Sequence, residues 1–119
     1  MITFIHIPRT GGLALTEALR GTGVRADGHR FRLSDADVDE AITIVRDPLA
    51  REASLLAHWP DGPEWWFAPE SAWLDCDKPL LWVGHTETLA EDVESLRNLI
   101  PGIGLLPTGY NASFPRSLT

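Results

Sequence analysis

Three short apolar runs recur along the chain, separated by longer segments of mixed polarity. They lie at Ile2–Ile7, Ala41–Val45 and Pro79–Val83. Runs of this length, bounded by proline, glycine or charged residues, are typical of strands that are buried on both faces. The pattern therefore predicts three buried strands.

Helical patterning follows the first two runs. The first predicted helix extends from Gly11 to about Arg20, where two glycines end it. The second begins with Asp47 as its N-cap and Pro48 in the first helical position, and it ends before Pro60. Its apolar positions recur at helical spacing and are expected to face the core: Leu49, Ala53, Leu56 and Ala57.

The third predicted helix starts at the capping box Thr88-Leu-Ala-Glu91 and ends at Pro101-Gly102. Its buried face is expected to consist of Leu89, Val93 and Leu96. Residues 60–70 combine prolines with aromatic side chains, which predicts an aromatic loop over one face of the sheet. Residues 24–33 are compatible with a short strand or a loop.

Strands that alternate with helices imply βαβ units and a mostly parallel sheet covered on both faces. The sequence shows no repeat and no internal boundary, so residues 1–119 are expected to form one α/β domain. Ligands of such sheets bind at the carboxyl ends of the strands. The turns at residues 8–12 and 46–48 directly follow strands and are expected at that edge.

Composition and charge narrow the function classes. The net charge of −7 argues against a general binder of nucleic acid or anionic membranes. No apolar run approaches the roughly 20 residues that span a membrane. Residues 1–58, however, carry seven arginines against eight acids, so this half repels an anion much less than the whole chain does.

Cysteine use and the first residues of the chain favour a cytoplasmic location. The single cysteine, Cys76, cannot form an internal disulfide. The chain begins in a strand-like segment that lacks the charged and apolar regions of a signal peptide. The histidines and acids show no metal-ligand spacing such as H-E-x-x-H, and no metal is expected.

The stretch at residues 4–12, Phe-Ile-His-Ile-Pro-Arg-Thr-Gly-Gly, places a strand, a tight glycine turn and a helix N-terminus in succession. Such a turn favours negative charge, and Arg9 adds a fixed cation, so the natural ligand is a phosphate or a sulfate. Turns of this kind also occur for packing reasons alone. The stretch does not match the G-x-x-x-x-G-K-[ST] loop that binds nucleoside triphosphates.

A second anion motif extends from Val45 to Ser54 and reads Val-Arg-Asp-Pro-Leu-Ala-Arg-Glu-Ala-Ser. Arg46 leaves the strand just before the helix, and Ser54 lies about two turns into it, on the same side as Arg51. A guanidinium and a hydroxyl together form an anion clamp. On its own, the motif is explained more simply by a surface pair of Arg46 with Asp47 and a solvated serine.

Together the two motifs resemble those of the sulfotransferase family, most closely its carbohydrate-type branch. The donor in that family is 3′-phosphoadenosine 5′-phosphosulfate (PAPS). There, His-Ile-Pro-Lys-Thr-Gly-Gly holds the 5′-phosphosulfate and Val-Arg-Asp-Pro-x-x-Arg-x-x-Ser holds the 3′-phosphate; His6–Gly12 and Val45–Ser54 correspond here. The resemblance continues, more weakly, through Trp82–Glu87 and through Leu106–Ser113 with Asn111.

The resemblance implies a P-loop NTPase-like three-layer sandwich, in which a small, mostly parallel sheet is flanked by helices. The chain would be an unusually short member of the family. Arg46 and Ser54 would bind the 3′-phosphate, and the 5′-phosphosulfate would be surrounded by Arg9, Thr10, Gly11, Gly12 and Leu13. The family has lysine where this chain has Arg9, whose planar head also supplies positive charge.

The implied reaction is the in-line transfer of a sulfuryl group to a hydroxyl or amine of a small-molecule or carbohydrate acceptor. Arg9 would be the catalytic cation, and a base must take the acceptor proton. His29, in the segment after the first helix, is the first candidate base, because related enzymes place His or Glu there. His58, four residues after Ser54, is the second. Each is equally compatible with a histidine that has no catalytic role.

Other functions remain to be weighed. A non-catalytic module that binds PAPS or adenosine 3′,5′-bisphosphate is the main alternative, motivated by Arg9 and the short chain. A small-molecule kinase would need the Walker pattern, and a cysteine phosphatase would need arginine at position 82, six residues after Cys76, where Trp82 stands. The sequence identifies neither the acceptor nor the oligomeric state. A homo-oligomer is an option because so small a sheet could complete its pocket with a partner.

Overall fold

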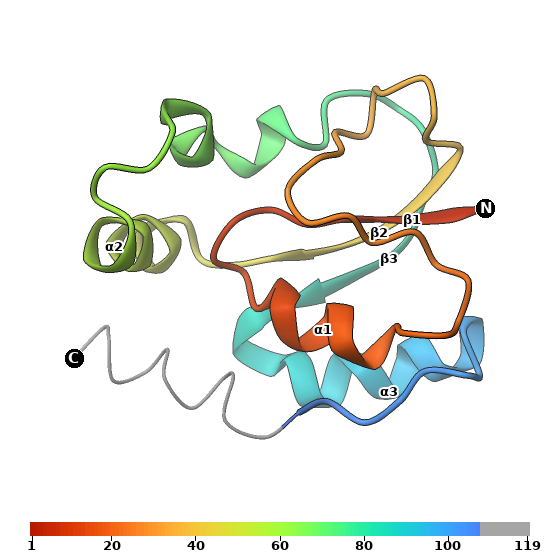
Figure 1. Cartoon of the computed structure of the whole chain (residues 1–119). Coiled ribbons are helices and arrows are strands. Elements are labelled where there is room, and N and C mark those ends of the chain that lie inside the picture. The colour runs from red at the N-terminus through yellow and green to blue at the C-terminus, as the bar shows by residue number, and fades with distance from the viewer. Residues whose placement is uncertain (108–119) are drawn as a thin grey trace.

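A three-stranded parallel sheet forms the centre of the structure, a computed structural model that describes residues 1–107. Its strands are β1 (Ile2–Ile5), β2 (Glu40–Val45) and β3 (Leu80–His85), in the order β1-β2-β3. Both pairings are parallel, which confirms the predicted sheet. The carboxyl ends of the strands therefore meet at one edge, which is on the left in Figure 1.

Helices and irregular segments cover opposite faces of this sheet. Figure 1 shows α1 (Gly12–Ala18) and α3 (Leu89–Leu99) on one face. On the other face lie the loop between α1 and β2 and the segment with two 3₁₀ helices, Glu64–Phe67 and Glu70–Ala72. α2 (Pro48–His58) lies beyond the carboxyl ends of the strands.

Two hydrophobic clusters, one on each face, hold the layers together. Successive side chains of a strand point to opposite faces, so neighbouring residues such as Phe4 and Ile5 join different clusters. The cluster beneath the helices includes Ile42, Leu15, Leu89 and Leu96, and the other includes Ile7, Phe31, Leu33 and Trp73. β1 and β2 are thus buried on both faces, as their continuous apolar runs predict. The predicted burial of the third strand is wrong, because β3 lies at the edge of the sheet and Leu81 and Val83 are each 38% exposed.

α2 begins where the sequence predicts. Asp47 is the N-cap, and its carboxylate accepts a hydrogen bond from the backbone N–H of Ala50 at 3.0 Å. Pro48 occupies the first helical position, where its missing N–H costs nothing. The helix ends at His58, before Pro60, which is also as predicted.

The predicted buried stripe of α2 is wrong. Leu49 is 77% exposed and Leu56 is 54% exposed, and Ala53 and Ala57 are exposed as well. The helix buries Arg51, Ser54 and Leu55 instead. The physical reason is the position of α2 at the edge of the sheet, where its inner side meets a polar backbone turn rather than the hydrophobic face of the strands.

α3 has its predicted bounds and buried face, but its predicted capping box does not form. Leu89, Val93 and Leu96 are all at most 2% exposed. Thr88 is the N-cap without a side-chain capping bond, and its hydroxyl donates to Asp92 Oδ2 at 2.9 Å. The carboxylate of Asp92 also accepts the backbone N–H of His85 at 2.7 Å, so it draws Thr88 away from the helix backbone.

The remaining segments complete the comparison with the sequence predictions. In the open region 24–33, Arg25 forms a single parallel bridge to Thr3 and the rest is irregular. The stretch 108–113, with Asn111, lies outside the described residues. Among residues 1–107, no helix has the length and apolar character needed to cross a membrane.

Candidate functional site

The turn at residues 8–12 follows β1 and has a backbone that strongly restricts its sequence. Arg9 and Gly11 adopt left-handed conformations, with φ of 62° and 93°. A Cβ atom on Gly12 would lie only 2.0 Å from Cδ2 of His6, so the imidazole ring packs directly on the glycine. Thr10 is buried, and its hydroxyl donates to the Ile7 carbonyl at 2.8 Å. The residues of the turn and the His6 ring therefore together fix its backbone conformation.

The two anion motifs meet at this turn. Arg9 Nε donates a hydrogen bond to Ser54 Oγ at 2.8 Å. Arg46 Nη1 donates to the carbonyl oxygen of Arg9 at 3.1 Å. Two guanidinium groups and a hydroxyl, from the turn, the end of β2 and the second turn of α2, are thus gathered at the carboxyl edge of the sheet.

Arg51 connects the same turn to the aromatic segment. Its side chain is 4% exposed and donates three hydrogen bonds to backbone carbonyls. Nε bonds Pro8 O at 2.9 Å, Nη1 bonds Ala68 O at 2.8 Å, and Nη2 bonds Trp66 O. A buried arginine satisfied by carbonyl groups is a structural brace, so Arg51 fixes Trp66 relative to the anion turn.

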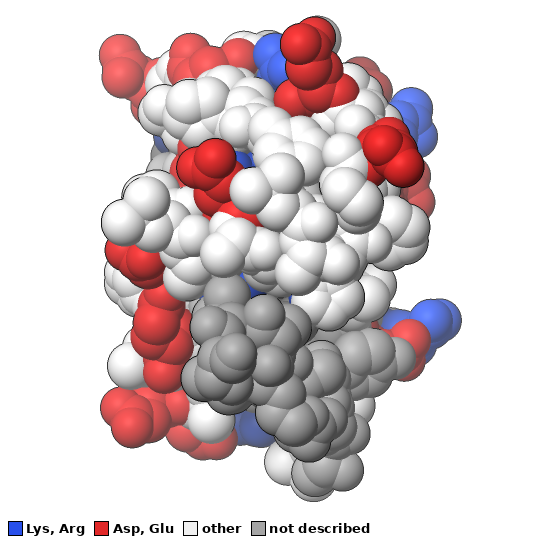
Figure 2. Space-filling model, turned by 90° about the vertical axis from the view of Figure 1, so that its left-hand side faces the viewer, with Lys and Arg blue, Asp and Glu red and all other residues white. Residues whose placement is uncertain are grey.

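The cations of the site lie close enough to disfavour one another. Burial and the charge of Arg46 lower the pKa of Arg9. Burial also lowers the pKa of Arg46, although the carboxylates of Glu87 and Asp47 raise it. Desolvated like charges are relieved by an anion placed between them. Figure 2 shows this end of the molecule, with acidic groups around a mostly uncharged centre and Lys or Arg visible only in small areas.

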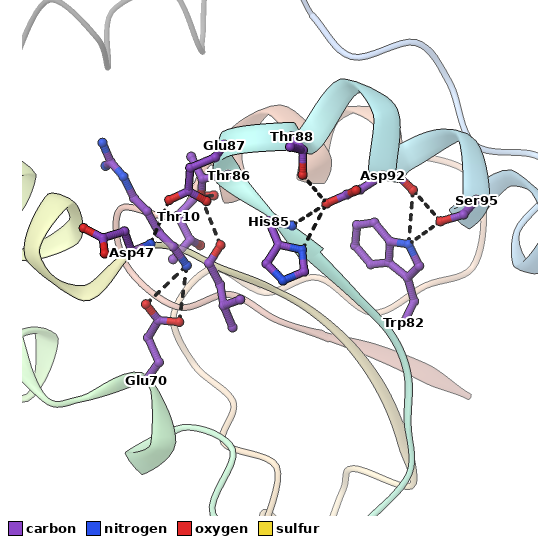
Figure 3. A network of polar contacts seen from close by, with 12 residues as sticks. Thr10, Asp47, Glu70, Trp82, His85, Thr86, Glu87, Thr88, Asp92 and Ser95 are labelled. Carbon is purple, nitrogen blue, oxygen red and sulfur yellow. Dashed lines mark hydrogen bonds and ion pairs between the residues drawn. The ribbon is translucent and has the colours of Figure 1, made fainter.

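Two carboxylates already accept hydrogen bonds from the backbone N–H groups that directly precede α2. Glu70 accepts the N–H of Arg46 at 3.2 Å and 3.3 Å, and Glu87 accepts the N–H of Asp47 at 2.8 Å (Figure 3). Burial raises the pKa of Glu70. A phosphate at this motif would therefore be bound by the side chains of Arg46 and Ser54 and not by the N-terminus of the helix.

The residue after β3 closes the edge of the sheet. The hydroxyl of Thr86 donates to the carbonyl oxygen of Thr10 and lies 3.3 Å from that of Val45 (Figure 3). Because Val45 ends β2 and Thr10 belongs to the turn after β1, one side chain ties all three strand ends together. Thr86 lies in the stretch Trp82–Glu87, which carried only a weak part of the resemblance.

A cavity of about 210 Å³ opens beside the turn. Pro8, Arg9 and Gly11–Leu13 line one side of it, and His6, His29, Trp59 and Trp66 line the other. The ring centroids of His29 and Trp66 are 5.4 Å apart, and those of Trp59 and Trp66 are 5.7 Å apart. The cavity thus joins the anion turn to a group of aromatic rings.

The two histidines of the cavity are neutral at pH 7. Burial and the neighbouring His29 lower the pKa of His6 to about 3, and burial lowers the pKa of His29 as well. Nδ1 of His29 lies 2.8 Å from the carbonyl oxygen of His6. Because a carbonyl only accepts, Nδ1 carries the hydrogen and Nε2 keeps its lone pair. His29 therefore has the protonation state of a general base.

The sequence-predicted site residues fall into four groups. Arg9, Gly11, Gly12, Leu13 and His29 line the cavity; Arg46 and Ser54 bond to Arg9 beside it; and Thr10 turns its hydroxyl toward Ile7. His58 is exposed, does not line the cavity, and donates from Nδ1 to the Ser54 carbonyl at 3.0 Å.

Sequence reasoning did not assign roles to several residues of the site. The bracing role of Arg51 has a signal, since it belongs to the second motif. Trp59 and Trp66 line the cavity, but the sequence gives no way to separate them from Trp73, which lies in the core at 1% exposure. Glu70 carries no sequence signal at all.

Among residues 1–107, no three His, Cys, Asp or Glu side chains lie together as a metal site would require. Comparison with family models, curated proteins and solved structures finds no match for this chain.

Proposed function

We propose that this protein is a sulfotransferase of P-loop-like α/β fold that transfers the sulfuryl group of PAPS to a hydroxyl or amine. The hydrogen bond from Arg9 to Ser54 carries the proposal. It joins the motif that the resemblance assigns to the 5′-phosphosulfate with the motif that it assigns to the 3′-phosphate. A nucleotide that bears both groups on one ribose needs both motifs in one place.

The residues at this edge fit such a donor. Arg46 and Ser54 would hold the 3′-phosphate, and the 5′-phosphosulfate would lie against Arg9 and residues 10–13. Glycine is required at position 12 because the His6 ring occupies the space that a side chain would take. Two phosphate groups would also neutralise guanidiniums whose pKa values are lowered by burial.

The donor supplies a sulfuryl group: a new bond forms from sulfur to the acceptor oxygen, the bond from sulfur to the nucleotide phosphate breaks, and its electron pair leaves with adenosine 3′,5′-bisphosphate. His29 Nε2 takes the proton of the acceptor and later returns it to solvent. Arg9 offsets the negative charge that develops on the leaving phosphate. The buried Arg51 side chain bonds to the carbonyl oxygens of Pro8 and Trp66 and so fixes the turn relative to Trp66.

A non-catalytic nucleotide-binding module is the second candidate. The observation that favours it is the same hydrogen bond, because it holds Nε of Arg9 beside Ser54 in the 3′-phosphate motif. If Arg9 keeps this bond when nucleotide is bound, its guanidinium contacts the 3′-phosphate and does not neutralise the leaving group, whereas the enzyme requires Arg9 to turn toward the 5′-phosphosulfate. The variant Arg9→Lys separates the candidates: turnover that appears only with lysine favours the module, and turnover in the natural chain favours the enzyme.

Calorimetry with adenosine 3′,5′-bisphosphate, compared with ATP and magnesium, tests nucleotide binding. We expect the bisphosphate to bind and to raise the melting temperature, since a ligand of the folded state stabilises it by mass action. Incubation with sulfur-labelled PAPS and hydroxyl acceptors tests transfer. Failure of the bisphosphate to bind, together with no transfer, would exclude both candidates.

A further inference from the structure

The wall of the cavity that faces the anion turn is aromatic and held in place. Trp59 is the C-cap residue of α2, and Trp66 lies in the 3₁₀ helix Glu64–Phe67. Their rings meet edge to face, with an interplanar angle of 88°, and Arg51 holds the backbone of Trp66. The rings of two different elements thus form one surface suited to a flat apolar group.

The cavity offers no charge to a second ligand. Arg9 is the charged residue in its lining, and the proposed donor engages it. His6 and His29 are kept neutral by burial. An ionised acceptor would lose its hydration without gaining a partner of opposite charge, which costs several kcal/mol. The lining therefore favours an uncharged ligand.

The size of the cavity sets an upper limit on what it encloses. An apolar cavity of about 150 Å³ holds one benzene molecule. Without nucleotide the cavity has about 210 Å³, which corresponds to one ring with a substituent or two fused rings, and a phosphosulfate against Arg9 would take up part of this volume. A sugar chain would leave most of its polar surface outside.

Polar groups belong to the residues of the lining. Among residues 1–107, three side-chain nitrogens are buried without a hydrogen bond, namely Nδ1 of His6, Nε1 of Trp66 and Nε1 of Trp73. Unsatisfied buried groups are uncommon in native structures, and two of these three belong to residues that line the cavity, although the atoms themselves lie beneath its surface. Nε2 of His29 adds an acceptor for a hydroxyl proton. The cavity thus combines aromatic walls with a small number of polar groups, as binding sites for small molecules do.

We propose that this cavity binds the acceptor substrate and that the acceptor is a small, uncharged aromatic alcohol of one or two rings. Its ring lies against Trp59 and Trp66, and its hydroxyl faces His29 Nε2. The role as acceptor rests on the proposed function, whereas the ligand class follows from the cavity itself. The ring and the hydroxyl are both needed, the first for affinity and the second for reaction.

Calorimetric titration of the full chain with 2-naphthol, without nucleotide, tests the binding site directly. N-acetylglucosamine serves as the comparison ligand of the carbohydrate class. The variant Trp59→Ala removes a lining ring from a residue that is 49% exposed, and Leu56→Ala removes an apolar side chain of α2 that is 54% exposed and outside the lining. Both positions are half exposed, so both variants should fold.

We expect 2-naphthol to bind the natural chain and Leu56→Ala alike, and to bind Trp59→Ala about 2- to 10-fold more weakly, as the loss of one aromatic contact implies. N-acetylglucosamine should bind much more weakly than 2-naphthol. Equal affinities of the two variants would overturn the proposal, and so would tighter binding of the sugar.

Addition of nucleotide separates this inference from the proposed function. Binding of adenosine 3′,5′-bisphosphate without binding of 2-naphthol would refute the aromatic acceptor and leave the sulfotransferase intact. Binding of 2-naphthol without any binding of the bisphosphate would support the cavity and refute the sulfotransferase. Labelled sulfate on 2-naphthol, reduced in Trp59→Ala and unchanged in Leu56→Ala, would support both.

Discussion

Arg9 and Ser54 are 45 residues apart in the chain, yet Nε of the first donates to Oγ of the second at 2.8 Å. The contact crosses from the turn after β1 to the second turn of α2. Ser54 is fully buried, and burial lowers the pKa of Arg9. Ser54 therefore accepts a hydrogen bond from a partly desolvated guanidinium. A phosphate that binds Arg9 will lie within reach of the Ser54 hydroxyl.

Removal of this hydroxyl should weaken nucleotide binding. We expect Ser54→Ala to bind adenosine 3′,5′-bisphosphate about 10- to 100-fold more weakly, because a hydrogen bond to a charged group contributes about 1.5–3 kcal/mol. Calorimetry measures the change. Ser71→Ala, at an exposed serine outside the motifs, is the matched control and should bind as the natural chain does. Equal binding by both variants would remove Ser54 from the site.

Gly12 should tolerate no side chain. A methyl group there would lie 2.0 Å from the ring of His6, which is itself buried directly after β1. We expect Gly12→Ala to lower the free energy of unfolding by about 1–3 kcal/mol or more, the usual cost of overpacking. Urea denaturation measures it. Gly102→Ala, where a Cβ would meet only Thr22 Cγ2 at 3.9 Å, should change stability by less than about 0.5 kcal/mol.

The clash can be assigned to its partner by a double variant. If the ring of His6 is the obstacle, Gly12→Ala should cost less in a chain that already carries His6→Ala. Equal costs in both backgrounds would mean that the backbone of the turn, and not the ring, requires glycine.

The sequence predicted the parts of the fold that follow from local rules. Uninterrupted apolar runs implied three strands, of which β1 and β2 are buried on both faces and the edge strand β3 is not. Asp47-Pro48 marked the start of α2 because capping and proline geometry act within a few residues. It also placed both anion motifs at one edge, since parallel strands share their carboxyl ends. These inferences need no knowledge of what packs against what.

The errors arose where long-range packing decided the outcome. The apolar spacing of Leu49 and Leu56 suggested a buried stripe, but α2 lies beyond the strand ends and uses Arg51 and Ser54 to contact the turn. Thr88 failed as a cap because Asp92 competes for its hydroxyl. Periodicity shows which residues share a helix face and does not show which face meets the protein.

Arg51 should be essential to the fold as a brace. We expect Arg51→Met to lower the free energy of unfolding by about 3 kcal/mol or more, because three buried carbonyl groups would lose their donor. Tryptophan fluorescence should shift to longer wavelength, since Trp66 is no longer held. Arg20→Met removes an exposed arginine, whose side chain is 71% accessible and pairs with Glu17, and should cost less than about 1 kcal/mol.

The variant Arg51→Lys distinguishes a role of the guanidinium geometry from a role of the positive charge alone. Arg51→Lys keeps the positive charge but cannot reach three carbonyls with a fork of donors. We expect most of the destabilisation to remain in this variant. Full stability of Arg51→Lys would show that the charge, and not the geometry of the guanidinium, matters at this position.

The buried histidines should make stability depend on pH. Burial, with His29 beside it, lowers the pKa of His6 to about 3, against 6.5 for an ordinary histidine. The unfolded chain therefore binds more protons between these values, so the stability is complete above pH 6.5 and falls as the pH drops toward 3. For His6 alone the loss at pH 5 is about 2 kcal/mol.

Urea denaturation from pH 7.5 to 5 measures this dependence of stability on pH. His6→Gln should reduce the slope, and the smaller slope that remains comes from His29, whose pKa is also lowered by burial. Identical slopes in the natural chain and the variant would mean that His6 is protonated in the folded state.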